Sequence, residues 1–146
     1  MLHATESISL LLCTLAQERY ALPMQAVREV LRWRPPTPIP GTRPAILGVI
    51  HHRGAVLPIV DLRLLLGMTS TPPTRNTRLI VVEQDGISAA LVSDSVADLI
   101  LTDPSAIEPP AAAQDSHLHG VLLHDQQPVG VLDLRSLFAT LTHDER

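Results

Sequence analysis

The apolar residues of this chain fall into short runs, and none of them follows a helical period for long enough to form a large helix. The runs are rich in leucine and β-branched residues, which is typical of strands of about four to eight residues. They are SISLLLCTLA (7–16), AILGVIHH (45–52), AVLPIV (55–60), RLIVVE (78–83), ISAALVS (87–93), HLHGVLLH (117–124) and PVGVLD (128–133). This pattern predicts an all-β fold.

Polar, proline-containing connectors separate many of these runs. Proline has no N–H to donate to a strand ladder and restricts the residue before it, so such segments favour loops. The connectors cover residues 35–44, 69–77 and 102–116. We expect three short helices in the rest of the chain, around residues 24–29, 61–66 and 133–141.

Two of these expected helices carry capping signals. Asp61 and Asp133 each precede an apolar turn, where a carboxylate accepts hydrogen bonds from the free N–H groups at the start of a helix. Gly67 stands where a residue in the left-handed conformation would end the first of the two.

The two halves of the chain resemble each other. Segment VLPIVDLRLLL (56–66) is similar to PVGVLDLRSLF (128–138), and YALPMQAVREVL (20–31) is similar to AALVSDSVADLI (89–100). The first comparison matches Asp61 to Asp133, and the second matches Val27 to Val96. The shared Asp-Leu-Arg favours duplication over chance. Because exposed sheet edges promote aggregation, we expect the repeated strands to close into two small barrel lobes that pack together.

Composition limits both the core and the partners. The chain has 146 residues, a net charge of −4 and only three aromatic residues, Tyr20, Trp33 and Phe138. The core must therefore be aliphatic, and aromatic platforms for stacking nucleic-acid bases are nearly absent. The sequence contains no run of basic residues that would neutralise phosphates, so we expect no nucleic-acid partner.

Cys13 is the single cysteine, so no internal disulfide can form, and its place within LLLCTL predicts an unreactive core thiol. The N-terminus lacks the pattern of a secretory signal peptide. The run ISLLLCTLA is too short to cross a bilayer. We expect a soluble, cytoplasmic protein without direct membrane insertion.

The seven histidines raise the question of a metal site. His51 and His52 are adjacent in an expected strand, where neighbouring side chains point to opposite faces, so they do not share an ion. His117 and His119 can share a face, and with His124 they could supply three nitrogens to zinc. No C-x-x-C or H-E-x-x-H motif accompanies them. We therefore expect no metal and no cofactor, and a small histidine-dependent metalloenzyme is the remote alternative.

Catalytic motifs are also missing from the sequence. It contains no G-x-S-x-G elbow, phosphate-binding glycine loop or dinucleotide fingerprint. Asp94 and Asp98 are expected to be exposed acids in a turn rather than a catalytic pair. We expect no enzyme.

Arg53 is the strongest candidate for a binding residue. It stands between an expected strand and Gly54, where the chain turns. Its planar guanidinium carries five donors suited to carboxylates and carbonyls, and arginine is enriched at binding hot spots. An ordinary exposed arginine at a loop tip explains the residue equally well from the sequence alone.

Several motifs taken in order resemble the CheW family of chemotaxis coupling proteins. The first half contains YALP, V-R-E-V, PPTPIP and G-V-I-x-x-R-G followed by x-V-L-P-I-V-D-L, and the second contains LIVV, ALVSDSV and G-V-L-L-x-D-x-x-P-V-G-V-L-D-L. The likeness covers roughly residues 7–141, and 44–62 is its most specific part. It implies two five-stranded, SH3-like β-barrels packed around a shared apolar interior. The whole chain, 1–146, would be one domain with a lobe boundary near 67–78 and flexible termini at 1–6 and 142–146; which strands cross between the lobes stays open.

The resemblance also implies a non-enzymatic adaptor. Such proteins couple the helical hairpin tips of membrane chemoreceptors to the regulatory domain of the histidine kinase CheA, and they are recruited to receptor arrays at the membrane. Carried over by motif, the receptor-binding residues are Val27, Glu29, Gly48 and Arg53. Gly48 would let the receptor helix approach closely. The kinase-contacting residues are left unassigned.

One departure from the family pattern concerns partner choice. His51 and His52 replace the usual Asn-Leu before Arg-Gly, which makes them possible specificity positions. Two alternatives within the family follow, a decoy that binds without relaying signals and a paralog that serves a twitching or other non-flagellar array.

Overall fold

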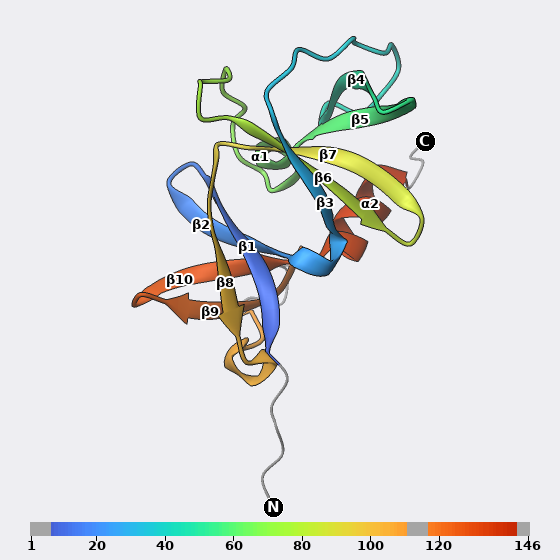
Figure 1. Cartoon of the computed structure of the whole chain (residues 1–146). Helices are drawn as coiled ribbons and strands as arrows, with labels where there is room; N and C mark the ends of the chain where they lie inside the picture. Colours follow the sequence, from blue (N-terminus) through green and yellow to red (C-terminus); the bar gives the residue numbers. More distant parts are fainter. Residues whose placement is uncertain (1–6, 111–116, 143–146) are drawn as a thin grey trace, which may run out of the picture.

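The computed structural model describes residues 7–110 and 117–142, which form two five-stranded sheets (Figure 1). The first sheet has the order β8-β1-β2-β10-β9, and we call its elements the first lobe. Its strands are β1 (Ile8–Leu15), β2 (Glu18–Pro23), β8 (Ser95–Thr102), β9 (Leu118–His124) and β10 (Gln127–Leu132). The second sheet has the order β3-β6-β7-β5-β4 and defines the second lobe. Its strands are β3 (Val27–Arg32), β4 (Ile46–His52), β5 (Ala55–Asp61), β6 (Arg78–Gln84) and β7 (Ile87–Ser93).

The predicted all-β class with two five-stranded lobes is confirmed, but several elements differ from the prediction. The helix expected over 24–29 is wrong: a single 3-10 turn covers Met24–Ala26, and β3 begins at Val27. β2, β3 and β8 had no separate prediction. β3 and β8 are edge strands in which charged residues interrupt the apolar runs, Arg28 and Glu29 in β3 and Asp98 in β8.

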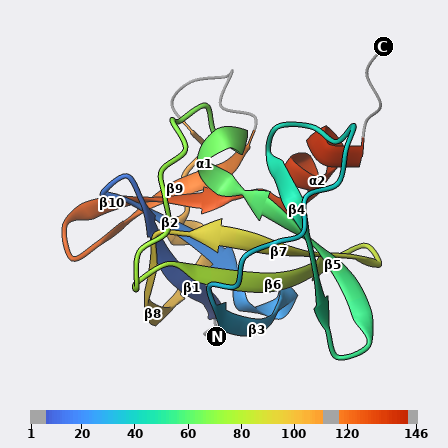
Figure 2. The ribbon, with the colours of Figure 1, turned by 90° about the horizontal axis from the view of Figure 1, so that it is seen from above.

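The two halves of the sequence exchange strands. β1 and β2 share a sheet with β8, β9 and β10, while β6 and β7 share the other with β3, β4 and β5. When β1 is matched to β6 and the following strands in order, the two sheets have the same strand order. In Figure 1 the second lobe lies above the first, and Figure 2 looks down on it. Strands therefore cross between the lobes, and neither lobe is one continuous segment.

Each lobe is closed by a backbone bridge between the segment that follows one edge strand and the opposite edge strand. After β3, Thr37 exchanges two backbone hydrogen bonds with Val49 of β4, of 2.8 and 2.9 Å, and after β8, Glu108 does the same with Val121 of β9. A glycine precedes each bridged valine. A Cβ on Gly48 would lie 2.3 Å from the Thr37 carbonyl oxygen, and one on Gly120 would lie 2.6 Å from that of Glu108. Both glycines therefore allow the closing segment to approach.

The largest core cluster lies between the two lobes. Leu11, Leu15 and Leu22 of the first lobe pack there with side chains of β5, β6 and β7 from the second. The helix α2 (Leu134–Thr142) adds Leu134, Leu137 and Phe138. A smaller cluster fills each lobe. The lobes thus share an aliphatic interior, and they are held together by apolar burial.

Cys13 lies in this shared core and is fully buried. Burial raises the pKa of its thiol to about 11. The predicted core position of Cys13 is confirmed, and because the thiolate is the reactive form of cysteine, the raised pKa disfavours reaction there.

The capping predictions are also confirmed. The Asp61 carboxylate accepts from the Arg63 N–H at 3.0 Å at the start of α1 (Leu62–Leu65), and Gly67 has a φ of +82° just beyond it. Asp133 accepts from the Ser136 N–H at 3.2 Å at the start of α2. Among the described residues, no helix is long and apolar enough to span a membrane. The termini expected to be flexible lie outside the described residues, except Thr142, where α2 ends.

Candidate binding surface

Three of the predicted site residues meet where the β4–β5 hairpin reaches the edge strand β3. Glu29 comes from β3, His52 ends β4, and Arg53 stands in the turn with a φ of +51°. Arg53 Nη2 donates to Glu29 Oε2 at 3.0 Å and Arg53 Nε donates to Glu29 Oε1 at 3.2 Å. His52 Nε2 lies 2.8 Å from Glu29 Oε1. We call these residues the Glu29 cluster.

The Glu29 cluster holds the Arg53 guanidinium at the surface in one orientation. The Arg53 side chain is 74% exposed, while those of Glu29 and His52 are 29% and 14% exposed. Hydrogen bonds from Arg53 first and His52 second lower the pKa of Glu29 to about 2. Glu29 is therefore ionised at every physiological pH. The paired hydrogen bonds fix the guanidinium fork, which leaves its outer edge to meet a partner.

We predict that Arg53→Gln raises the pKa of Glu29 from about 2 toward its ordinary value of 4.5, because the charged donor is removed. A carboxylate with a depressed pKa stabilises the fold above its unfolded pKa and loses that contribution as the pH falls. The contribution of Glu29 is thus complete above about pH 4.5 and fades toward pH 2. Carboxyl chemical shifts measured across this range report the titration directly. A wild-type Glu29 that titrates near 4.5 would contradict the geometry.

The other predicted residues lie apart from this cluster. Val27 begins β3, is half-buried and packs against the shared core. Gly48 is buried, and the chain's own Thr37 approaches it closely. His51 is exposed and paired across the hairpin with Val56, whereas His52 turns to Glu29. The two histidines therefore do point to different sides, as expected for a strand.

The three histidines of the metalloenzyme alternative do not gather. His117 Nδ1 lies 3.1 Å from Ser136 Oγ, and His124 Nε2 lies 3.6 Å from a carboxylate oxygen of Asp125. His119 is exposed. Within residues 7–110 and 117–142, no three His, Cys, Asp or Glu side chains are placed to hold a metal ion.

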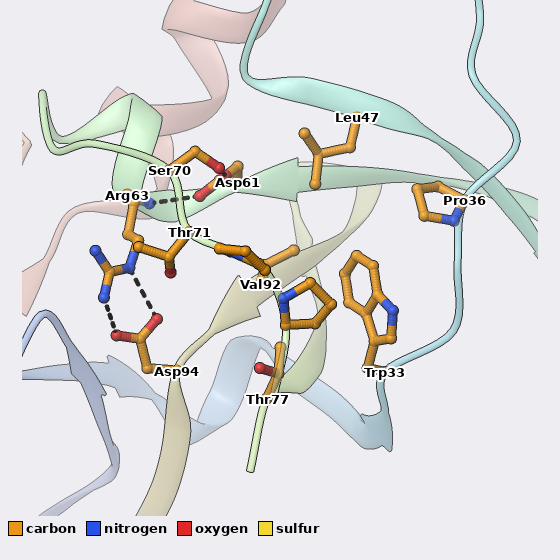
Figure 3. Close-up of a pocket in the computed structure, with 12 residues that line it drawn as sticks. Trp33, Pro36, Leu47, Asp61, Arg63, Ser70, Thr71, Thr77, Val92 and Asp94 are labelled. Carbon is orange, nitrogen blue, oxygen red and sulfur yellow. Dashed lines mark hydrogen bonds and ion pairs between the residues drawn. The ribbon is translucent and has the colours of Figure 1, made fainter. Parts of the chain in front are cut away.

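Sequence reasoning missed an ion pair that links the lobes. Asp94 lies between β7 and β8 and accepts two hydrogen bonds from Arg63 of α1, at 3.0 and 2.6 Å (Figure 3). The same carboxylate accepts from the Ala16 N–H of the first lobe at 2.8 Å. Asp94 is thus a half-buried structural acid and not an exposed turn residue, while Asp98 is exposed on β8. The repeated Asp-Leu-Arg was the available signal, since its arginine makes this contact.

Beside this ion pair lies a hollow of about 250 Å³ (Figure 3). Its apolar wall is formed by Trp33, Pro36, Leu47 and Val92, and the connector over 69–77 borders it. The Asp61 carboxylate at its far end accepts a hydrogen bond from the Ser70 hydroxyl at 2.6 Å. We call this the apolar hollow.

Comparisons with known proteins agree with the architecture. The family model for the CheW-like domain matches residues 9–142. The chemotaxis protein CheW of Rhizobium meliloti (strain 1021) is 36% identical over 125 residues, which cover 83% of this chain and 81% of that protein. The protein FrzA of Myxococcus xanthus is 35% identical over 127 residues, which cover 84% and 79%. The crystal structure of the scaffolding protein TtCheW from Thermoanaerobacter tengcongensis matches with a TM-score of 0.85 and 30% identity, over 93% of this chain and 90% of that one.

Proposed function

The chain belongs to the family of CheW-like domains, and we propose that it is a non-catalytic scaffold that couples chemoreceptor tips to the regulatory domain of a CheA-type histidine kinase. The observation that carries the proposal is the exposed guanidinium of Arg53, fixed by two hydrogen bonds to Glu29. A guanidinium held in one orientation loses little freedom when a partner's carbonyl or carboxylate groups bind it. The Glu29 cluster is the centre of the receptor-binding face.

The β4–β5 hairpin supplies the rest of this face. His51 and Val56 are directly opposed across the hairpin and both are exposed. Directly opposed residues share one face of a hairpin, so a partner at the hairpin tip that contacts one of them would also contact the other. His52 is occupied by Glu29, which makes His51 the histidine available to select the partner. Val27, half-buried at the start of β3, would form the apolar edge of the contact.

This role needs no strong single contact. Receptors held in a cluster at the membrane raise the effective concentration of every neighbouring site, so modest affinities add up to a stable assembly. Recruitment to such arrays from the cytoplasm follows from the proposed contacts.

Reconstitution tests the proposal. The purified chain, a receptor signalling tip and the full-length kinase are mixed, and both co-sedimentation and kinase autophosphorylation are measured. We expect one complex that contains all three proteins, with kinase activity above that of the kinase and receptor alone.

Two outcomes would redirect the assignment. Capture of both partners together with lower kinase activity would indicate a decoy rather than a coupler. Capture of neither partner, from flagellar or twitching arrays, would contradict the proposal. Omitting the chain from the mixture is the matched control.

A further inference from the structure

Three arginines line one hollow at the end of β3 and the start of β6. Arg32, Arg75 and Arg78 surround a space of about 550 Å³. None of the three has a carboxylate partner within the part of the chain that the structure describes. The sequence shows no run of basic residues here, because the strand register and the loop before β6 bring the three together. Positive charge is therefore concentrated at one place on a protein whose net charge is −4.

The arrangement places like charges against each other. Arg32 and Arg78 are directly opposed in the antiparallel pair of β3 and β6, and like charges in that position are destabilising. The Arg78 guanidinium donates to the carbonyl oxygens of Arg75 and Thr77, at 2.9 Å each. The Thr77 hydroxyl in turn accepts from the Thr74 N–H at 2.8 Å. The loop thus holds the Arg78 guanidinium in place opposite Arg32, and an anionic partner would reduce the repulsion between the two charges.

The arginine hollow adjoins the apolar hollow. Both are lined by Trp33 and Thr77, and the Trp33 indole lies beside Pro36 (Figure 3). At the far end, Asp61 and Asp94 are already held by Ser70 and Arg63. The combined groove therefore has a basic end, an apolar middle and an acidic far end.

We propose that this groove binds an acidic segment of a partner protein. The segment's carboxylates bind Arg32, Arg75 and Arg78, and a neighbouring apolar side chain packs against Trp33. Arginine and tryptophan are both enriched at protein-binding hot spots. A free phosphate ion would contact the guanidinium groups but would leave the apolar hollow unused, so the observations favour a peptide. The site does not include the Glu29 cluster and does not depend on the proposed function.

Trp33 is the only tryptophan of the chain, so its fluorescence reports on the groove. The probe is a short synthetic peptide in which leucines adjoin glutamates, titrated into the full chain. We expect a saturable change in Trp33 emission that weakens as salt is added. Replacing both Arg32 and Arg75 by glutamate should weaken binding on the order of tenfold or more, because attraction becomes repulsion. Arg135→Glu, which reverses the charge of an exposed arginine of α2 outside the groove, is the control and should bind like the wild type.

Folding of the variant is checked by thermal unfolding. In the double variant, Arg32→Glu sets a carboxylate opposite Arg78. We therefore expect the unfolding temperature of the double variant to equal or exceed that of the wild type. A peptide with lysines in place of the glutamates should not bind. An equal fluorescence change with inorganic phosphate alone would reduce the site to a general anion site and overturn the proposal. Concentration-dependent self-association that Arg32→Glu abolishes would also overturn it, because the occupant would then be a second copy of this chain.

Discussion

Replacing Gly48 by alanine should lower the free energy of unfolding by about 3 kcal/mol or more, since overpacking and backbone strain each cost roughly 1–3 kcal/mol. The added Cβ would lie 2.3 Å from the Thr37 carbonyl oxygen and 2.7 Å from its carbon. Both are backbone atoms, so no side-chain rotation relieves the clash. Gly48 also has a φ of +147°, which is unfavourable for a residue with a side chain. Relief requires Thr37 to move, which breaks the two hydrogen bonds that close the second lobe.

Chemical denaturation of matched alanine variants checks this prediction. Gly41 has a φ of +82° but no atom within 4 Å of an added Cβ, so Gly41→Ala carries only the conformational penalty, about 1–2 kcal/mol. Gly120→Ala should be intermediate, because one of its two closest contacts is the movable Ile107 side chain at 2.5 Å. If Gly48→Ala unfolds at the same denaturant concentration as Gly41→Ala, the closure is not as close as described.

Gly48 also illustrates how far the sequence predicts the fold. The family resemblance picked out this glycine and gave it a partner's helix as its neighbour, whereas the neighbour is the chain's own Thr37. The pairing was hidden because Thr37 lies in a proline-rich connector that reads as a loop. Buried strands such as β6 and β7 were predicted correctly because both of their faces are apolar. The edge strand β3 was missed because three of its six residues are charged, so it contains no continuous apolar run.

The candidate site was predicted in its members but not in its contacts. Glu29 and Arg53 followed from the resemblance, yet nothing in the sequence placed them in contact. β3 and the β4–β5 hairpin lie at opposite ends of the strand order of the second sheet. Only closure of the lobe brings those edges together. The gathering of Arg32 and Arg78 likewise depends on strand register, which a single sequence does not specify.

Arg53→Glu should weaken binding of the receptor tip on the order of 100-fold, because the variant sets two carboxylates side by side and presents the wrong charge. Arg135→Glu is a closely matched control. The Arg135 side chain is 75% exposed and bonded to Asp85 at 3.1 Å, while that of Arg53 is 74% exposed and bonded to Glu29 at 3.0 Å. Binding of an immobilised receptor tip, measured side by side, separates a local effect from a general change in charge.

The swapped variant, Glu29→Arg with Arg53→Glu, distinguishes two roles of the ion pair. It restores opposite charges between β3 and the hairpin tip, so we expect the stability lost in Arg53→Glu to return. The exposed group at position 53 is then a carboxylate, so binding of the receptor tip should stay weak if the Arg53 guanidinium contacts the receptor. Recovery of binding in the swapped variant would mean that Arg53 only orders the hairpin, and the receptor-binding face would then have to lie elsewhere on the second lobe.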